Sequence, residues 1–449
     1  MEKIKASLPK GFRDFLPEQT AKRNFIAKTI QSVFEKYGYQ GIETPVMENL
    51  KTLTGKYSDE VNKLLFKTLN SGDFLKKADA ELLAEKNSNK IGNQISEKGM
   101  RYDLTVPLAR YVVQHQNDLV FPFKRFHIAP VWRADRPQRG RFREFYQCDV
   151  DIIGSKSLLN EVEFAQIYTE AFQKLDLKVE ILINSRKILI GIIEAIDAQE
   201  YSTSIITTID KIDKIGLERV IEEVAKLGLS EKQTSKLKSF LEITDINKIE
   251  LENDTLKQGV EEVQFVLKHK VANVKFDISL ARGADYYTGI IFEVFCTEFD
   301  FGALGGGGRY DNLTEMFGKK DVTGVGVSFG FERVYDILES LNRFPKNIKS
   351  APKLLFLHFG EAEQEYAFEM LQKVRKTNIT AEIYPDNAKF KKQMNYANGK
   401  GVEYICVIGS NEMESGKLTL KNMATGEQDS LTIEGIISLL KLKHPISLN

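Results

Sequence analysis

Residues 123–153 read FKRFHIAPVWRADRPQRGRFREFYQCDVDII, and this stretch has the clearest strand pattern of the chain. Apolar residues recur in Phe123–Arg133 and again in Phe142–Ile153, each a run rich in strand-forming residues. The segment between them, Ala134–Gly140, holds a proline and a glycine and therefore favours a turn. We predict a long antiparallel hairpin.

The hairpin stands out by its charge. The chain has 449 residues, 42% of them hydrophobic, which is enough for two or three domains with cores of their own. Lys plus Arg and Asp plus Glu both total 63, so overall charge indicates no polyanionic partner. Between Lys124 and Glu144, however, seven basic residues stand against two acidic ones. The hairpin is therefore a local polycation.

Cysteine usage and hydropathy bear on location. Cys148, Cys296 and Cys406 are too far apart for a disulfide framework or a metal-ligand spacing, which favours a reducing compartment and no structural zinc. The segment Met1–Lys10 is charged, and no run of 18 apolar residues occurs. We expect a cytoplasmic protein without membrane contact.

Before the hairpin, the segment from Pro17 to Tyr37 carries one apolar stripe and predicts a helix. Gly41–Met47 reads as a short strand, and Pro45 within it favours an edge position. We expect this helix and edge strand to form a dimer surface. Met100–Pro107 also reads as strand-rich sequence.

The rest of the chain separates into a helical part, a second strand-rich part and a C-terminal domain. Residues 184–267 are helical in pattern and predict an inserted subdomain at about 185–270. Strands are expected at 274–280 and 290–295. Residues 344–352 are the expected linker between a domain at 1–343 and one at 353–449. The latter alternates strand and helix and predicts a small α/β domain.

Three arginines have the chemistry needed to hold a nucleotide. Arg133 ends a predicted strand, Arg282 precedes a glycine and two tyrosines, and Arg333 follows a glycine series into a helix. A guanidinium group is a planar fork that suits phosphate oxygens. A lone arginine is most often a surface residue, so the neighbouring residues decide its interpretation.

Two glycine patterns have simpler interpretations. The series Gly324, Gly326 and Gly330 has the wrong spacing for a dinucleotide fingerprint, and no suitably placed acidic residue follows it. The run Gly305–Gly308 could be a flexible turn, or it could let the backbone approach a bound amino acid closely.

These segments resemble the motifs of a known family. Three of them resemble the motifs shared by class II aminoacyl-tRNA synthetases: Gly11-Phe12-Arg13-Asp14 with the following helix and Pro45, the hairpin through Phe142-Arg143-Glu144-Phe145, and Gly324–Arg333. Two others are similar to motifs specific to histidyl-tRNA synthetases: Arg282-Gly283-Ala284-Asp285-Tyr286-Tyr287-Thr288-Gly289 and Gly307-Gly308-Arg309-Tyr310-Asp311. The similarity spans nearly the whole chain in the same order.

The resemblance implies an α+β fold. It comprises a six-stranded class II antiparallel sheet flanked by helices, a helical insertion and a C-terminal α/β anticodon-binding domain. It also implies a homodimer that activates L-histidine with ATP to histidyl-adenylate and transfers it to the 3′ end of tRNA(His). Mg²⁺ is expected to accompany the ATP, and no metal bound by the protein itself is expected.

The resemblance also assigns individual residues. The histidine ammonium group is assigned to Asp103 and Thr105, with Leu104 between them and Gln147 assisting. The imidazole is assigned to Asp151 and Tyr287, supported by Tyr286 and Tyr310. ATP is assigned to Arg133 and Arg282 at the α-phosphate, Arg333 at the γ-phosphate, and Phe142 beside Arg141 at the adenine, with Phe145 as a competing candidate. Arg133 and Arg282 also border the histidine and are the expected catalytic residues. No general base is expected, since the five histidines lie outside the motifs.

One position departs from the common form of the family. Asp103 and Leu104 stand where many bacterial members have Glu and Gly. Because Asp is shorter than Glu, the depth of the ammonium contact stays open.

For tRNA, the expected contacts are Arg136, Gln138 and Arg139 in the hairpin turn. Lys389, Lys391, Lys392 and Lys400 form an acid-free basic stretch, which is either a solvated helix face or an RNA contact.

Two alternatives remain. One is a regulatory paralogue of the family that binds histidine and assists ATP phosphoribosyltransferase. Such paralogues are expected to lack the C-terminal domain. The other is a different class II synthetase, such as the threonyl or prolyl type, which the segment from Arg282 to Gly289 opposes.

Overall fold

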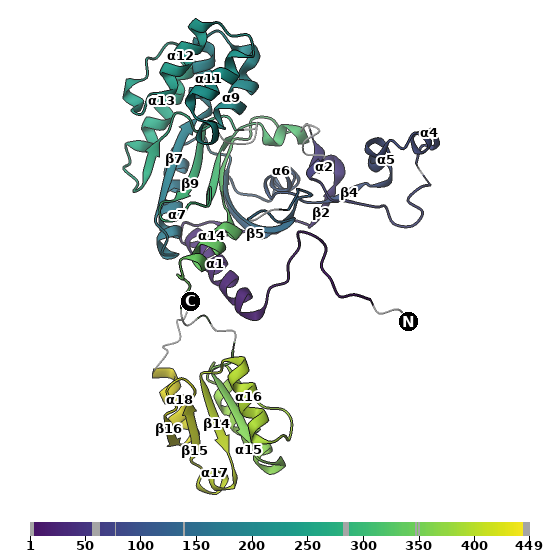
Figure 1. The fold of residues 1–449 in the computed structure, drawn as a ribbon, viewed down its shortest axis with the longest axis vertical. Coiled ribbons are helices and arrows are strands. Elements are labelled where there is room, and N and C mark those ends of the chain that lie inside the picture. The colour runs from purple at the N-terminus through teal and green to yellow at the C-terminus, as the bar shows by residue number, and fades with distance from the viewer. Residues whose placement is uncertain are drawn as a thin grey trace. The chain divides into compact units, whose positions relative to one another are not determined.

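The computed structural model describes residues 4–55, 63–76, 78–137, 140–281, 287–345, 348 and 351–442 (Figure 1). The chain divides into two compact units. The first consists of Met1–Asp14 and Lys22–Phe344, and the second of Phe15–Ala21 and Pro345–Asn449.

The first unit is built on an eight-stranded sheet. In spatial order its strands are β1 (Gln40–Gly41), β5 (Phe123–Trp132), β6 (Glu144–Ile153), β11 (Gly324–Phe329), β10 (Gly305–Tyr310), β9 (Ile290–Cys296), β7 (Val179–Ser185) and β8 (Val274–Phe276). The six strands from β5 to β7 pair antiparallel, whereas β1 and β8 pair parallel at the two edges. The six-stranded antiparallel sheet and the hairpin are thus confirmed, with Phe123 opposite Ile153 and Trp132 opposite Glu144.

Several local predictions are wrong. Gly41–Met47 is not one strand, because pairing with β5 ends at Gly41 and β2 (Met47–Asn49) belongs to another sheet. Pro45, which has no N–H to donate, lies in the gap. The strand predicted at 274–280 ends at Phe276. For the run Gly305–Gly308 two interpretations were open, and the turn is excluded because the run is a central strand.

Met100–Pro107 is also not a strand. Strand β4 (Lys98–Met100) ends there, and helix α6 (Thr105–Gln114) begins. The Asp103 carboxylate accepts a hydrogen bond from Val106 N at 3.2 Å, which satisfies one free donor of the first turn. Pro107 also lies in that turn, where a missing N–H costs nothing. The chain is therefore helical from Thr105, although β-branched residues there suggested a strand.

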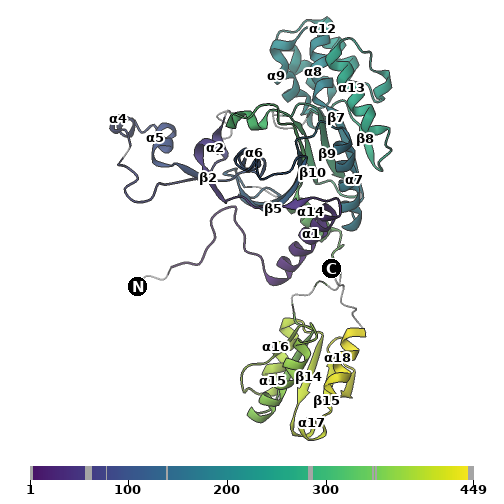
Figure 2. The same ribbon diagram turned by 180° about the vertical axis from the view of Figure 1, so that it is seen from behind.

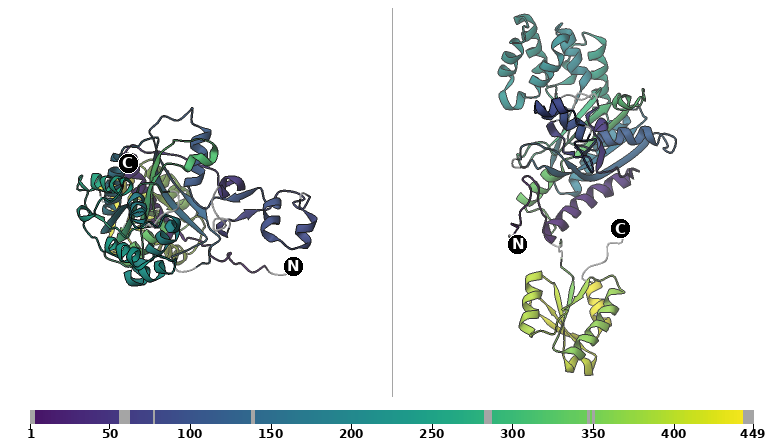
Figure 3. Two further views of the ribbon diagram at one scale, coloured as in Figure 1. Left: turned by 90° about the horizontal axis from the view of Figure 1, so that it is seen from above. Right: turned by 90° about the vertical axis from the view of Figure 1, so that its right-hand side faces the viewer.

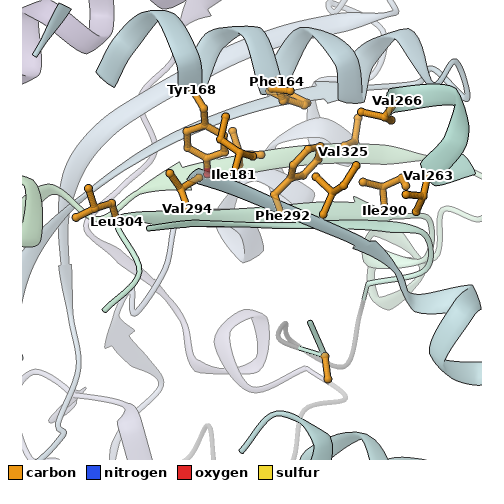
Figure 4. Packing of buried hydrophobic residues seen from close by; sticks show 14 of the residues in the cluster. Phe164, Tyr168, Ile181, Val263, Val266, Ile290, Phe292, Val294, Leu304 and Val325 are labelled. Atoms are coloured by element: carbon orange, nitrogen blue, oxygen red, sulfur yellow. The ribbon is translucent and has the colours of Figure 1, made fainter. Parts of the chain in front are cut away.

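The two faces of the sheet differ in character. On one face, α7 (Leu159–Lys174) packs Phe164 and Tyr168 onto apolar strand residues such as Val325, as Figure 4 shows. On the other face, α6 covers part of β5, where Leu104 packs with Val131. That second face carries the polar side chains of β5 and β6.

Helices α1 (Pro17–Lys36) and α14 (Phe331–Ser340) are joined by an ion pair between Arg23 and Glu332. A short helix, η3 (Leu313–Phe317), lies between β10 and β11 in sequence.

A helical group lies beyond β7 and β8 (Figures 1 and 2) and is drawn in teal in Figure 3. It comprises α8 (Arg186–Ala195), η1 (Gln199–Tyr201), α9 (Ser202–Ile209), α10 (Ile212–Ile215), α11 (Leu217–Ala225), α12 (Glu231–Leu241), η2 (Ile246–Lys248) and α13 (Asp254–Leu267). Helices α8 and α13 cross closely, since a Cβ at Gly191 would lie 2.5 Å from Leu256 N. Glycine is therefore required at this crossing.

A small sheet, in the order β2, β4 and β3 (Lys67–Thr68), completes the first unit with helices α2 (Leu50–Thr54), α4 (Ala80–Ala84) and α5 (Ser88–Ile95).

The second unit is a small α/β domain. Its elements are β12 (Leu354–His358), α15 (Glu361–Arg375), β13 (Ala381–Ile383), α16 (Phe390–Lys400), β14 (Tyr404–Ile408), α17 (Ser410–Ser415), β15 (Leu418–Asn422), β16 (Gln428–Leu431) and α18 (Ile433–Leu442). The strand order is β13-β12-β14-β15-β16, and the first three strands are parallel. Separate apolar clusters cover the two faces of this sheet, as in other α/β domains.

Candidate active site

A cavity of about 630 Å³ lies over the hairpin and the glycine-rich strands. Its wall is formed by the ends of β5 and β6, by β9, β10 and β11, by the start of α14 and by residues of the helical group. It includes six residues assigned from the sequence: Arg133, Arg141, Phe142, Gln147, Tyr287 and Arg333. The structure thus gathers residues that are up to 200 positions apart in the chain.

The other assigned residues fall into three groups. Asp103, Leu104, Asp151 and Tyr310 are buried and Thr105 is half-buried, and none of them forms part of the cavity wall. Arg136 is exposed on the hairpin turn. Arg282, Tyr286, Gln138 and Arg139 lie outside the described residues.

Backbone contacts fix the Arg133 side chain. Its Nε donates to Tyr102 O at 3.0 Å, and its guanidinium lies 5.1 Å from the centre of the Phe145 ring. A guanidinium group is attracted to the face of an aromatic ring, and this contact helps to hold it in place. Arg133 is therefore a preorganised cation on the cavity wall.

Arg333 lies in the first turn of α14, whose N-cap is Gly330. Its Nη1 donates to Ala303 O at 2.6 Å, which ties the helix to the loop before β10. The N-terminus of a helix has free N–H groups and a partial positive charge, so it favours an anion. The helix end and Arg333 together suit a phosphate group.

The aromatic candidates for an adenine platform are both engaged on one face. The Arg13 guanidinium lies 3.2 Å from the centre of the Phe142 ring, and Arg133 covers Phe145. Both rings line the cavity, so an adenine could stack on the opposite face of either one. Phe142 and Phe145 therefore both remain candidates.

Asp151 lies behind the cavity in a fully buried network. Its Oδ2 lies 2.6 Å from Arg125 Nη2, and its Oδ1 accepts a hydrogen bond from the Tyr310 hydroxyl. The arrangement needs glycine on β11, because a Cβ at Gly326 would lie 1.9 Å from Asp151 Oδ1, and one at Gly324 would lie 2.2 Å from the Tyr310 ring.

Burial shifts the ionisation of this face. Burial raises the pKa of Asp103 to about 6, against the opposing charge of Arg133. It raises the pKa of Asp149 to about 7, although Arg125 opposes the shift. Burial, reinforced by Arg125, lowers the pKa of His127 to about 3, so this imidazole is neutral.

Glu332 joins distant parts of the site and was not predicted from the sequence. It accepts hydrogen bonds from Arg23 at 2.8 and 2.9 Å, from Arg13 at 2.6 Å, and from Tyr146 N at 3.3 Å. It therefore fixes the N-terminal segment, α1 and the hairpin to the helix that carries Arg333. Because Arg13 and Arg23 lie more than 300 residues from Glu332, sequence spacing gives no signal of this contact.

Arg125, His127 and Asp149 also escaped the sequence assignment. They alternate with apolar residues on β5 and β6, so the period-two pattern places them on the face of Asp151. That pattern was the available signal.

Arg309, in the segment similar to a histidine-specific motif, has a structural role. It forms an ion pair with the buried Glu161 of α7 at 2.6 Å and donates to Ser155 O and Ser157 O. It therefore anchors β10 to the start of α7 and takes no part in the cavity.

Within the described part of the chain, no group of three or more His, Cys, Asp or Glu side chains could hold a metal ion. Among the same residues, no helix is long and apolar enough to cross a membrane.

Comparisons with known proteins agree with this architecture. The model of the family "Histidyl-tRNA synthetase" matches residues 11–75 and 86–334, and that of "Anticodon binding domain" matches residues 353–443. A histidyl-tRNA synthetase structure from Nostoc sp. PCC 7120 superimposes with a TM-score of 0.83 at 27% identity, covering 98% of this chain and 100% of its own. The fold is that of a class II aminoacyl-tRNA synthetase.

Curated relatives narrow the assignment. "Histidine--tRNA ligase" of Phocaeicola vulgatus is 50% identical, covering 97% of this chain and 99% of its own. The protein of the same name from Christiangramia forsetii is also 50% identical, with the same coverage. This chain belongs to the histidyl-tRNA synthetase family.

Proposed function

We propose that this chain is a histidine--tRNA ligase, which activates L-histidine with ATP to histidyl-adenylate and transfers the histidyl group to the 3′ end of tRNA(His). The observation that carries the proposal is the cavity in which Arg133 and Arg333 share a wall with Gln147 and Tyr287. Cations for a triphosphate thus lie beside polar groups suited to an amino acid. Relatives named histidine--tRNA ligase over nearly the full chain support the same reaction.

In the first step, the histidine carboxylate attacks the α-phosphate of ATP and pyrophosphate leaves. We assign the α-phosphate to Arg133 and Arg282 and the γ-phosphate to Arg333. The fixed position of Arg133 means that little reorganisation is needed as charge develops in the transition state. Catalysis rests on positioning and electrostatics, without a dedicated general base.

We assign the ammonium group of histidine to Asp103 and Thr105, with Leu104 between them and Gln147 assisting. The imidazole is assigned to Asp151 and Tyr287, supported by Tyr286 and Tyr310. Selectivity follows because a side chain that cannot hydrogen-bond would leave buried polar groups without partners.

We propose that Mg²⁺ enters with ATP. The carboxylates on the cavity wall are Asp135, Asp210 and Glu332, and Glu332 is already bound to Arg13 and Arg23. The described residues of the wall therefore offer few protein ligands, which suits a cation that keeps its waters and binds chiefly through phosphate oxygens. Bound there, Mg²⁺ would neutralise phosphate charge.

Two regions are proposed to contact tRNA. The hairpin turn with Arg136, Gln138 and Arg139 would meet the acceptor end. The C-terminal unit, within proposed boundaries of 353–449 after a linker at 344–352, would meet the anticodon. Of its basic stretch, Lys400 pairs with Glu382, whereas Lys389, Lys391 and Lys392 are exposed with no ion pair to a described residue.

We further propose a homodimer in the cytoplasm. After β1 in the chain, Val46 is 41% exposed, and Met47 at the start of β2 is 50% exposed, which supports a covered surface at these residues. All three cysteines are free, as expected in a reducing compartment. Sedimentation of the wild type and of Met47→Glu would test the dimer, since a monomeric wild type contradicts it.

ATP/pyrophosphate exchange with each amino acid in turn, followed by charging of a tRNA(His) transcript, tests the function. Exchange supported by histidine alone is the expected result. Exchange with no amino acid would favour a regulatory histidine-binding paralogue. The C-terminal unit, which matches the anticodon-binding family, and the places of Arg133 and Arg333 on the cavity wall argue against that alternative.

A further inference from the structure

The N-terminal segment fits closely against the hairpin, although the two are far apart in the chain. The backbone N–H of Arg143 donates to Gly11 O at 2.9 Å. A Cβ at Gly11 would lie 2.9 Å from Arg143 Cγ and 2.9 Å from Pro137 Cγ, and the φ of Gly11 is +89°. Only glycine suits such a position. This contact places Arg13, two residues further on, beside the cavity.

Arg13 joins two parts of the cavity wall. Its guanidinium lies 3.2 Å from the centre of the Phe142 ring, and its Nη2 donates to Glu332 Oε2 at 2.6 Å. Phe142 and Glu332 both line the cavity, whereas Arg13 lies behind them. Glu332 directly precedes Arg333 in α14. Arg13 therefore connects the hairpin to the helix that carries Arg333.

The fold does not depend on Arg13 for the pairing of Glu332. Arg23 donates to both oxygens of this carboxylate, at 2.8 and 2.9 Å. The side chains of Arg23 and Glu332 are 9% and 6% exposed, whereas that of Arg13 is 25% exposed. Since a buried carboxylate is costly only when it loses its partners, the loss of Arg13 leaves Glu332 satisfied. The contact of Arg13 with Phe142 is not needed for that purpose.

We infer that Arg13 is a positioning residue for ATP, which fixes the ring of Phe142 and the start of α14 relative to each other. The inference rests on the proposed function. Phe142 is one of the two candidates for the adenine platform, and the γ-phosphate is assigned to Arg333. Arg13 thus acts on both ends of one nucleotide without touching it. A guanidinium group suits this role, because it packs on an aromatic face and donates to a carboxylate at the same time.

The test measures ATP/pyrophosphate exchange by Arg13→Ala at varied ATP and varied histidine. A misplaced positioning group can cost up to about 10²-fold, so the KM for ATP should rise about 10- to 100-fold while the KM for histidine stays within about twofold. Arg13→Lys should recover part of the loss, because an ammonium group keeps the charge opposite Glu332 but lacks the planar group that packs on Phe142. An unchanged KM for ATP in Arg13→Ala would overturn the inference.

The matched control is Lys22→Ala. Lys22 of α1 pairs at 3.0 Å with Glu339, which lies in the same helix α14 but does not line the cavity. Lys22→Ala should leave both KM values unchanged. A rise in the KM for ATP equal to that of Arg13→Ala would show a general weakening of the attachment of α14, and it would overturn the specific role of Arg13.

A double-mutant cycle covers the case in which Arg13→Ala does not fold. Arg13→Lys and Phe142→Leu should have non-additive effects on the KM for ATP, since each removes the same contact. Additive effects would overturn the inference while leaving the proposed function intact. Absence of histidine-dependent exchange in the wild type would instead overturn the proposed function, and the inference with it.

Discussion

Gly326 is the position where one added methyl group should disturb the site most directly. In Gly326→Ala the new Cβ would lie 1.9 Å from Asp151 Oδ1 and 2.5 Å from Asp151 Cγ. Because Cβ contacts under 3.0 Å are essentially never seen, the carboxylate oxygen and the β11 backbone must move apart by at least 1.1 Å. Arg125 and Tyr310 hold this carboxylate, so such a shift breaks or strains both contacts.

The expected effects follow from these distances. A displacement of about 1 Å in a substrate-binding group can cost about 10²-fold in rate, and we expect a loss of that order in kcat/KM for histidine. Overpacking should lower the free energy of unfolding by about 1–3 kcal/mol. ATP/pyrophosphate exchange and thermal unfolding of the purified variant measure the two effects.

The matched control is Gly92→Ala in α5, where no atom lies within 4 Å of the new Cβ. That change should be neutral or stabilise the protein by about 0.4–1 kcal/mol, since it reduces the freedom of the unfolded chain. If Gly326→Ala matched the wild type in both exchange and unfolding, the close packing of Asp151 against β11 would be refuted.

Three further predictions concern other parts of the molecule. Arg282→Ala should keep the fold and lose adenylate formation by a factor of about 10² to 10³, and near-normal pyrophosphate exchange would contradict its assignment. Burial alone would raise the pKa of Glu332, but Arg23 and Arg13 outweigh it and hold the pKa below its ordinary value. The ion pairs of Glu332 therefore stabilise the folded protein above the pKa of the unfolded state, and this stabilisation is lost as pH falls through the pKa of the folded state. The difference in melting temperature between the wild type and Glu332→Gln should be present at pH 7 and should vanish in acid. A difference independent of pH would refute the ion pairs as its source. Phe359 is 57% exposed, and its ring centre lies 5.1 Å from that of Phe390, so it could stack on an RNA base. Phe359→Ala should therefore weaken tRNA binding by about 1–3 kcal/mol without changing ATP/pyrophosphate exchange, whereas Phe368→Ala, at a position 51% exposed, should change neither. Equal effects of the two variants on aminoacylation would argue against base stacking at Phe359.

The hairpin was predictable because its signals agree. Two runs of strand-forming residues and the turn with proline and glycine between them all indicate the same long hairpin. Helix α6 was not predictable in this way, because β-branched and apolar residues after Met100 suggest a strand. The hydrogen bond from Val106 N to Asp103 satisfies a donor in the first turn of α6, and this contact can be recognised only once the chain turns there.

The site was predictable in part. The resemblance assigned Arg133, Gln147, Tyr287 and Arg333, and the structure places all four on one cavity wall. It gave no assignment for Glu332, whose partners come from the far end of the chain. An acidic residue in the first turn of a helix, such as Glu332, is explained by its favourable interaction with the helix dipole. The sequence alone therefore gives no reason to expect a buried ion pair there.

The charge network of Asp151 and the glycine strands depend on each other. Arg125 and Asp151 are buried on β5 and β6, where uncompensated charges would be costly, and their closeness stabilises them only if the carboxylate has room beside β11. Gly326 provides that room on one face, and Gly307 lies so close to β11 that a Cβ there would be 2.2 Å from Gly326 O. A Cβ at Gly326 would therefore meet the Asp151 carboxylate directly, whereas a Cβ at Gly307 would disturb the charge network through the backbone of β11. The ion pair between Arg125 and Asp151 therefore depends on the close packing of β10 and β11. Gly307→Ala should accordingly weaken histidine binding, although Gly307 does not touch Asp151.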